Sequence, residues 1–307
     1  MGTIWVLFMI AATVLLAMAG GWTFRRALVL VTPSGHARTV REMPLSAAFG
    51  MLVIVLYILV AILAPLLAPF AEQDTSSAQF LPWGAPHYLG TDERGGDVLS
   101  RLIFGARNTI GIALVTTALA FLVGVALGLW AATVGGWVDQ VLGRFVDALM
   151  AIPALILSLL LLTIFGTSML TLILVIALVD STRVFRLARS VAQGIVVMDY
   201  IEAAKLRGEG TGRLIAKEIL PNATAPLVAE FGLRFCFVFL SISALSFLGL
   251  GIQPPTADWG SMVRETAGFI TFGDPTPLLP AGAIALLTVA VNFVVDWQLQ
   301  RASGLKE

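Results

Sequence analysis

Residues 199–222 form a charged segment between long apolar runs, and their composition suits binding better than catalysis. The segment carries too many charges to span a bilayer, so it must lie in water. Small and apolar residues predict a short helix at its start: Ile201, Ala203, Ala204 and Leu206. The glycines that follow end this helix, and residues 213–220 predict a second helix that Pro221 stops. The segment is therefore a helix, turn, helix projection, facing either a partner protein or the lipid surface.

Motifs for independent catalysis are absent from the sequence. It contains no Walker A pattern, no HExxH and no GxSxG, and the glycines at 208, 210 and 212 follow no predicted strand. The chain therefore has no evident means of hydrolysing ATP or a peptide, and ATP-driven work would need another subunit. His87 has no second ligand at metal-binding spacing and is interpreted as a loop residue, so no metal site is expected. The single cysteine, Cys236, cannot form an intrachain disulfide and is expected to contact lipid or a helix.

Two opposite charges lie inside an apolar run. Glu230 and Arg234 are four residues apart, so a helix would place them side by side. An unpaired charge near the centre of a bilayer costs roughly 2.5 to 3.5 kcal/mol, so each should face its partner or a polar cavity. We weigh two interpretations: a mutually neutralised structural pair, which is slightly favoured, and a lining of a translocation pathway.

The composition is that of an integral membrane protein. Hydrophobic residues make up 58% of the 307 residues and charged residues only 12%, against about 25% charged in soluble domains. The formal net charge of zero gives no reason to expect nucleic acid. Seven apolar stretches are long enough to span a bilayer: 3–23, 46–69, 107–134, 148–166, 168–190, 225–250 and 278–299.

The distribution of basic residues predicts the orientation. If residues 199–222 are cytoplasmic, fourteen of the nineteen Lys and Arg residues fall on that side, including Arg38 and Lys306. The N-terminus is then outside and the C-terminus inside. The first stretch resembles a signal peptide at Ala17–Ala19, but its arginines, Arg25 and Arg26, follow it. We interpret it as an added span facing lipid or a neighbouring subunit.

Several local pairings are expected. Gly124 and Gly128 form a small-xxx-small pair that favours close helix packing. Arg144 should pair with Asp147, and Asp180 with Arg183, because each pair lies one helical turn apart. Two further arginines are expected at the inner boundary, where they either contact headgroups or a partner or simply fix the orientation: Arg186 and Arg189.

The charged segment closely resembles the Glu-Ala-Ala loop of ABC importer permeases. The matching residues are Glu202, Ala203, Ala204, Gly208, Ile219, Leu220 and Pro221. In that family the loop forms a coupling helix in a groove of a cytoplasmic ATPase. A lipid-bound amphipathic loop is the alternative.

A second resemblance lies before the third apolar stretch. Its physical interpretation is a turn at 90–92, an N-cap at Asp97 and an ion pair of Asp97 with Arg101. The segment resembles the Gly-Thr-Asp-x-x-Gly-Arg-Asp signature of the dipeptide and oligopeptide branch, with Gly96 in place of arginine. The residues concerned are Gly90, Thr91, Asp92, Gly95, Asp97 and Arg101. A purely structural role and direct contact with a binding protein or substrate are equally weighted.

The third resemblance follows the sixth stretch. Glycines there should break the helix, and the tryptophan should lie at the outer interface. The match to the same permease branch includes Gly249, Gly251, Pro255, Trp259 and Gly260.

Together these motifs imply an all-α polytopic membrane protein with the type I ABC importer permease fold, which has six core spans, plus one extra N-terminal span. The implied divisions are 1–44 (extra span and cytoplasmic linker), 45–104 (first core span and extracytoplasmic loop), 105–300 (core permease with the coupling loop 199–222) and 301–307 (cytoplasmic tail).

The implied function is the membrane subunit of an importer of peptides or related small solutes in the bacterial cytoplasmic (inner) membrane. The implied partners are a second homologous permease, two ATPase subunits and an extracytoplasmic solute-binding protein. No cofactor is expected on this chain, whereas ATP and Mg belong to the ATPases. The rival classes are a secondary transporter or channel that uses Glu230 and Arg234, and a noncatalytic membrane scaffold.

Overall fold

The computed structural model describes residues 2–31 and 39–303, and every regular element in these ranges is a helix. A single isolated bridge joins Thr91 to Asp97. The helices are α1 (Gly2–Val31), α3 (Leu45–Leu67), α4 (Val98–Val134), α5 (Gly136–Met150), α6 (Ala154–Phe165), α7 (Met169–Val196), α8 (Asp199–Leu206), α9 (Thr211–Leu214), the π-helical η1 (Ile215–Ile219), α10 (Leu220–Phe247), α11 (Trp259–Thr266), the 3-10 helix η2 (Ala267–Phe272) and α12 (Leu278–Ser303).

Four described helices are long and apolar enough to cross a membrane, or five spans if α5 and α6 form one broken span. The four are α3, α4, the continuous helix Thr211–Phe247, and α12. Two further predicted stretches, 168–190 and 3–23, are not among these helices, each for its own reason. α7 is long enough but carries Asp180, Arg183 and Arg186 within its first 18 residues. Most side chains of α1 before Ala17 lie outside the described residues.

The single span predicted at 148–166 is wrong. α5 ends at Met150 and α6 begins at Ala154, and the two helices are bent by 88°. Pro153 explains the break, because it lacks the N–H that a continuing helix would need and fits the residue just before a new helix. α6 has only 12 residues, too few to cross the hydrocarbon core alone.

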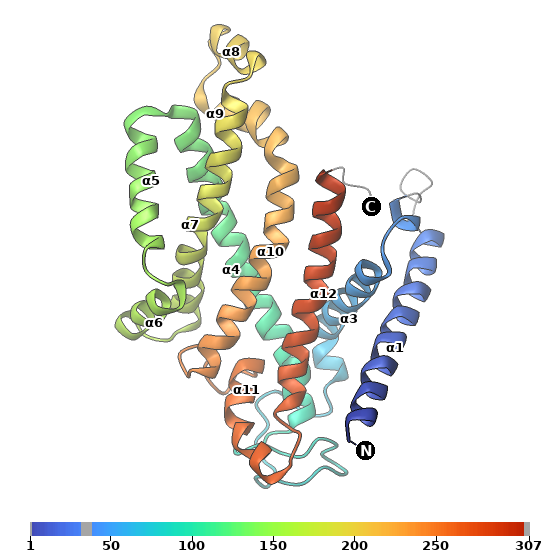
Figure 1. Ribbon diagram of the computed structural model, residues 1–307. Helices are drawn as coiled ribbons and strands as arrows, with labels where there is room; N and C mark the ends of the chain where they lie inside the picture. Colours follow the sequence, from blue (N-terminus) through green and yellow to red (C-terminus); the bar gives the residue numbers. More distant parts are fainter. Residues whose placement is uncertain (1, 32–38, 304–307) are drawn as a thin grey trace.

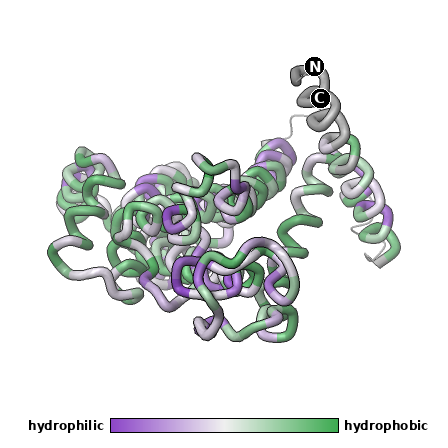
Figure 2. Tube along the Cα trace, turned by 90° about the horizontal axis from the view of Figure 1, so that it is seen from below, coloured by the Kyte–Doolittle hydropathy of each residue, from purple (hydrophilic) through white to green (hydrophobic). Residues whose placement is uncertain are grey.

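The helices stand side by side, and the two ends of the bundle differ (Figure 1). α8 projects from one end, together with the last turn of α12. The other end carries α11 and the irregular chain between α3 and α4. Figure 2 shows this second end face on: green and white cover most of the helices, and a strongly purple stretch lies in the loops nearest the viewer. Polar chain is thus gathered outside the apolar bundle.

The centre of the bundle depends on close contact between α4 and α7. A Cβ added at Gly124 would lie 2.7 Å from the Ser181 carbonyl oxygen, and one at Gly128 would lie 2.7 Å from the Phe185 carbonyl oxygen. Only glycine lets the two backbones approach this closely, so the predicted small-xxx-small contact is confirmed. The main core continues from this contact to α10 and α12, with Phe239 fully buried.

α1 lies at the edge of the bundle and packs on α3 (Figure 1). A Cβ at Gly21 would lie 2.6 Å from the Leu45 carbonyl oxygen, so this contact is also close. α3 in turn approaches α12, because a Cβ at Gly50 would lie 2.3 Å from the Ala290 carbonyl oxygen.

We predict that Gly128→Ala destabilises the protein by about 1–3 kcal/mol, because the new methyl group would collide with the backbone of α7. Gly111→Ala is the matched control on the same helix, since a Cβ there meets no atom within 4 Å. It should be neutral or stabilising by up to about 1 kcal/mol. Thermal unfolding of the two purified variants in detergent measures the difference, and equal melting temperatures would contradict the close contact.

Candidate functional site

The projecting segment 199–222 is a short helix, a turn and the start of a long helix. α8 ends at Leu206, and Gly208 follows with φ of 80°, a conformation that favours glycine. The carboxylate of Glu209 pairs with Arg207 at 3.1 Å and with Arg213 at 3.7 Å. It thereby links the two sides of the turn, although both arginines are mainly exposed and such pairs contribute little stability.

Pro221 does not stop the second helix, contrary to the sequence prediction. Residues 215–219 form a π-helix, and Pro221 lies in the first turn of α10, so that residues 211–247 form one continuous helix. Proline has no backbone N–H, so a helix tolerates it where that position would make no helical hydrogen bond. The change from π-helix to α-helix supplies such a position at the base of the projection.

The base of the projection is packed into the bundle. Ile201, Ala204 and Ile219 are fully buried. Ile201 and Ile219 belong to a cluster with Leu129 of α4 and Ala188 of α7. The α8 helix therefore has a buried side that fixes it to three long helices.

The opposite side of the projection is open. Glu202 and Ala203 are exposed, as are the apolar side chains of Val197, Tyr200 and Leu206, the last of these by 83%. Within the described residues, Glu202 makes no ion pair. Exposed apolar groups around a small residue are typical of a surface that binds a partner.

The charges inside the bundle form a network across two helices. Arg234 forms an ion pair with Glu230, with Nε 2.7 Å from Oε1, and its Nη1 lies 3.7 Å from Asp180 Oδ1 on α7. Arg183 approaches the same Asp180 oxygen at 3.8 Å. Both predicted pairs, Glu230 with Arg234 and Asp180 with Arg183, are thus present. The contact between Asp180 and Arg234 was not predicted, because it joins residues far apart in the sequence.

Arg234 is the most enclosed of these arginines, being 7% exposed. Its guanidinium also lies 4.6 Å from the centre of the Phe237 ring. Two carboxylates and an aromatic face therefore surround one buried cation. This arrangement supports a structural role for the pair.

The segment at 90–101 folds as a turn and a helix cap. Asp97 accepts from the Ser100 backbone N–H at 2.7 Å, which confirms the N-cap. Asp97 also contacts His87 Nδ1 at 3.0 Å, and His87 Nε2 lies 2.9 Å from Ser77 Oγ. His87 is therefore a buried loop residue, as predicted, and the described residues hold no group of side chains suited to a metal.

The predicted ion pair between Asp97 and Arg101 is wrong. Arg101 instead pairs with Asp92 and, at 2.9 Å, with Glu265 of α11. Asp97 is occupied by the cap and by His87, whereas the arginine reaches two buried carboxylates. Gly90 and Gly95 have φ of 73° and 80°. Both meet backbone carbonyl groups closely, so the turn requires glycine.

The segment after α10 forms a compact turn. Gly249 has φ of 86° and follows the helix end, and a Cβ at Gly251 would lie 2.0 Å from Ser246 Oγ. Position 260 also has no room for a side chain, because a Cβ added at Gly260 would lie 2.3 Å from the Ser243 carbonyl oxygen. The predicted break of the helix at these glycines is confirmed.

Trp259 does not lie at the outer interface as predicted but is buried, with 2% exposure. Its indole N–H donates to the Leu102 carbonyl at 2.9 Å. Its ring packs edge to face with Tyr57 and Phe239, at centroid distances of 5.6 and 6.2 Å. A Cβ at Gly105 would lie 2.6 Å from the indole, so this glycine makes room for it. Trp259 therefore joins α3, α4 and α10.

Asp258 beside it is fully buried and caps α11, accepting from Ser261 N at 2.8 Å and from Thr109 Oγ1 at 2.9 Å. Burial raises the pKa of this carboxyl, and the hydrogen bonds oppose the shift. The sequence analysis did not identify this residue. A possible signal was its position one residue before a helix with a serine three residues later.

Comparison with known proteins identifies the family. Residues 124–303 match the family described as binding-protein-dependent transport system inner membrane component. Residues 46–87 match the N-terminal TM domain of oligopeptide transport permease C. The chain belongs to this permease family.

Individual relatives agree with the family match. The chain is 34% identical to a dipeptide transport system permease protein of Alkalihalophilus pseudofirmus, over 81% of this chain and 83% of that protein. It is 34% identical to a di/tripeptide transport system permease protein of Pseudomonas aeruginosa, over 80% and 84%. A glutathione transport system permease protein of Pectobacterium atrosepticum is 29% identical, over 82% and 84%.

One solved structure, described as an amino acid ABC transporter with histidines, matches with a TM-score of 0.49 and 18% identity, over 66% of this chain and 94% of that chain.

The permease is thus an all-α, multi-pass protein of the inner membrane, and the predicted family and fold class are confirmed. The family name also implies that it works with a binding protein and an ATPase. α1 lies outside both matched ranges.

Two predictions concern charges near the end where α8 projects. Arg189 was expected either to contact headgroups or a partner or simply to fix the orientation, and the structure shows that it binds both oxygens of Asp139 on α5, at 2.5 and 2.6 Å. Arg144 and Asp147 make no ion pair with each other in the described part of the chain. Arg189 ties α5 to α7, which sequence spacing alone cannot indicate.

We predict that Arg234→Met destabilises the permease by about 3–5 kcal/mol, because it leaves the buried Asp180 and the partly buried Glu230 without their shared cation. Glu230→Gln in the same chain should recover part of this loss. Arg183→Met is the control, since its side chain is 40% exposed and its contact is long; it should cost less than about 1 kcal/mol. Denaturation in detergent measures all three. If Arg234→Met and Arg183→Met behave alike, the network does not stabilise the bundle.

Proposed function

We propose that this permease forms the membrane pathway of an ATP-driven importer that brings peptides or related small solutes into the cytoplasm. The support for the substrate class is that relatives named for dipeptide, di/tripeptide and glutathione transport share about 30% of its residues over most of the chain. The substrate within this class is set by the binding protein and by residues lining the pathway.

We propose that residues 199–222 couple the permease to a cytoplasmic ATPase. The observation that carries this proposal is the two-sided construction of α8. Ile201 and Ala204 fix it to the bundle, while Glu202 and Ala203 face outward beside exposed Leu206. Coupling requires that this surface bind the two states of the ATPase with different affinity. ATP and Mg then belong to the partner, and this chain itself performs no hydrolysis.

The proposed orientation places α8 and the last turn of α12 in the cytoplasm. The chain between α3 and α4, α11 and the start of α1 are then outside. Two observations support it: these groups lie at opposite ends of the bundle (Figure 1), and Lys and Arg residues are concentrated at the α8 end.

The outer segments suit a role in receiving substrate from the binding protein. Asp92, Arg101 and Glu265 hold the 90–101 turn against α11, so the outer surface is a rigid platform. We propose two homologous permeases, two ATPases and one binding protein, with the permease bundles rocking between inward-facing and outward-facing states.

A pathway that includes Glu230 and Arg234 is the second candidate role. Glu230 retains partial exposure, 18% for its side chain, whereas Arg234 is enclosed. A secondary transporter or channel would depend on this pair and need no ATPase.

We predict that Ala203→Glu reduces ATP hydrolysis by the purified complex at least about tenfold. The added carboxylate would project into a closely fitting partner surface while leaving the buried side of α8 intact. Ala71→Glu is the control, because it adds the same charge to an exposed position at the other end. The measurements are ATPase activity and recovery of the ATPase subunits on a tag carried by this chain.

Equal activity in the two variants would exclude docking through Ala203. Solute uptake into vesicles that contain this chain without an ATPase would overturn the importer and favour the secondary transporter.

A further inference from the structure

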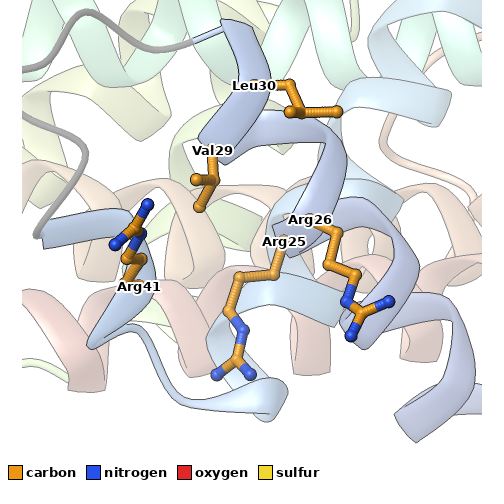
Figure 3. Close-up of a pocket in the computed structure, with 5 residues that line it drawn as sticks. All are labelled: Arg25, Arg26, Val29, Leu30 and Arg41. Atoms are coloured by element: carbon orange, nitrogen blue, oxygen red, sulfur yellow. The ribbon is translucent and has the colours of Figure 1, made fainter.

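An open cleft with three arginines lies beside the last turns of α1. Its volume is about 370 Å³, and it is lined by Arg25, Arg26 and Arg41 together with Val29 and Leu30 (Figure 3). Arg41 comes from the chain just before α3, and the other four residues come from α1. The cleft therefore forms only where α1 meets the start of α3.

Two of the arginines are held in place by contacts outside the cleft. Arg25 donates from one terminal nitrogen to the Met43 carbonyl at 2.9 Å. The Arg26 guanidinium lies 3.7 Å from the centre of the Trp22 ring, a favourable cation–π distance. The close approach of Gly21 to the Leu45 carbonyl fixes the two segments relative to each other. Packing thus brings the three arginines together and leaves their other guanidinium N–H groups available to a ligand.

The described lining of the cleft contains three arginines and no carboxylate. In the described part of the chain, none of these three guanidinium groups lies within ion-pair distance of a carboxylate. Like charges in one cleft repel each other, and an anion with several oxygens would relieve this repulsion. Guanidinium groups bind phosphate oxygens in a planar, two-pronged geometry that lysine cannot reproduce.

The apolar wall indicates where the anion comes from. Leu30 is 87% exposed and Val29 lines the same cleft. An acyl chain beside α1 would cover these side chains, whereas a free anion would leave them in water. Arginines at the end of an apolar helix are also placed at the depth of lipid headgroups.

We propose that this cleft binds a phosphate group, supplied by the headgroup of an anionic phospholipid, and that α1 is thereby fixed to one leaflet. The proposed orientation makes this the cytoplasmic leaflet, but the site itself does not depend on ATP coupling. Because α1 lies outside both ranges matched to the family, the site would be specific to chains that carry such a helix.

The test is lipid binding by the purified full-length chain, measured by native mass spectrometry from detergent. Phosphatidylglycerol and phosphatidylcholine are titrated separately. The informative variant is Arg26→Gln with Arg41→Gln, because both side chains are exposed and neither contributes a described hydrogen bond to the fold. We expect roughly a ten- to thirtyfold loss of phosphatidylglycerol affinity, because each arginine near an anionic lipid contributes about a three- to fivefold effect.

The matched control is Arg144→Gln with Arg186→Gln, which removes two exposed arginines elsewhere. It should lower affinity less than about threefold. A further variant, Arg26→Lys with Arg41→Lys, keeps the charge and loses the planar fork. It should bind several-fold more weakly than the original chain. If the lysine variant matches the original chain and the control loses as much affinity as Arg26→Gln with Arg41→Gln, the arginines act only as general positive charge, and the specific site is excluded.

A competition arm separates the two sources of phosphate. Glycerol phosphate and inorganic phosphate are added at millimolar concentration before phosphatidylglycerol. Retained lipid binding supports a lipid site, whereas displacement by either small anion shows a free-phosphate site and overturns the lipid assignment. Equal binding of phosphatidylcholine and phosphatidylglycerol would also overturn it. None of these readouts uses ATP or transport, so failure here leaves the proposed function untouched.

Discussion

The close contact of α4 with α7 is the constraint on which the rest of the permease depends. Gly124 and Gly128 bring the two backbones together, and Leu129, the residue after Gly128, lies in one buried cluster with Ala188. That meeting point is also where Ile201 and Ile219 of the projecting segment are buried. In a bilayer, lipid tails compete equally well for apolar side chains, so helices associate through close packing and polar contacts. The glycines therefore position the projecting segment as well as the core.

Polar contacts between helices complete this framework. Arg189 binds Asp139 between α7 and α5, Arg234 reaches Asp180 between α10 and α7, and Arg101 reaches Glu265 between α4 and α11. Each joins elements that short sequence spacing cannot connect. The bilayer makes such pairing more consequential, because a buried charge without a partner is costly there. The charges are thus arranged so that opposite charges on different helices lie close together.

This arrangement explains which sequence predictions were right. Some patterns confined to one helix were right: the cap at Asp97, the ion pair of Glu230 with Arg234, and the close approach at Gly124 and Gly128. The pairs predicted for Asp97 with Arg101 and for Arg144 with Asp147 were wrong. Sequence spacing shows which residues of one helix can meet, but it does not show whether a residue elsewhere in the fold binds the same side chain instead. Trp259 was assigned to the interface by residue type, but Gly105 on α4 provides a space for its ring. That complementarity is visible only in three dimensions.

The helix from 211 to 247 connects the two ends of the permease. It starts within the projecting segment, passes Arg234 near its middle and ends beside the Gly249 turn, where Ser246 Oγ accepts the Ile252 N–H. Near this second end it packs on Trp259, which contacts α3 and α4. α8 and the α11 end of the bundle are therefore joined by one continuous helix. The π-helical residues 215–219 are the place where that helix departs from regular geometry. π-helical turns within longer helices are found frequently at functional sites, and this one lies where the projecting segment joins the bundle.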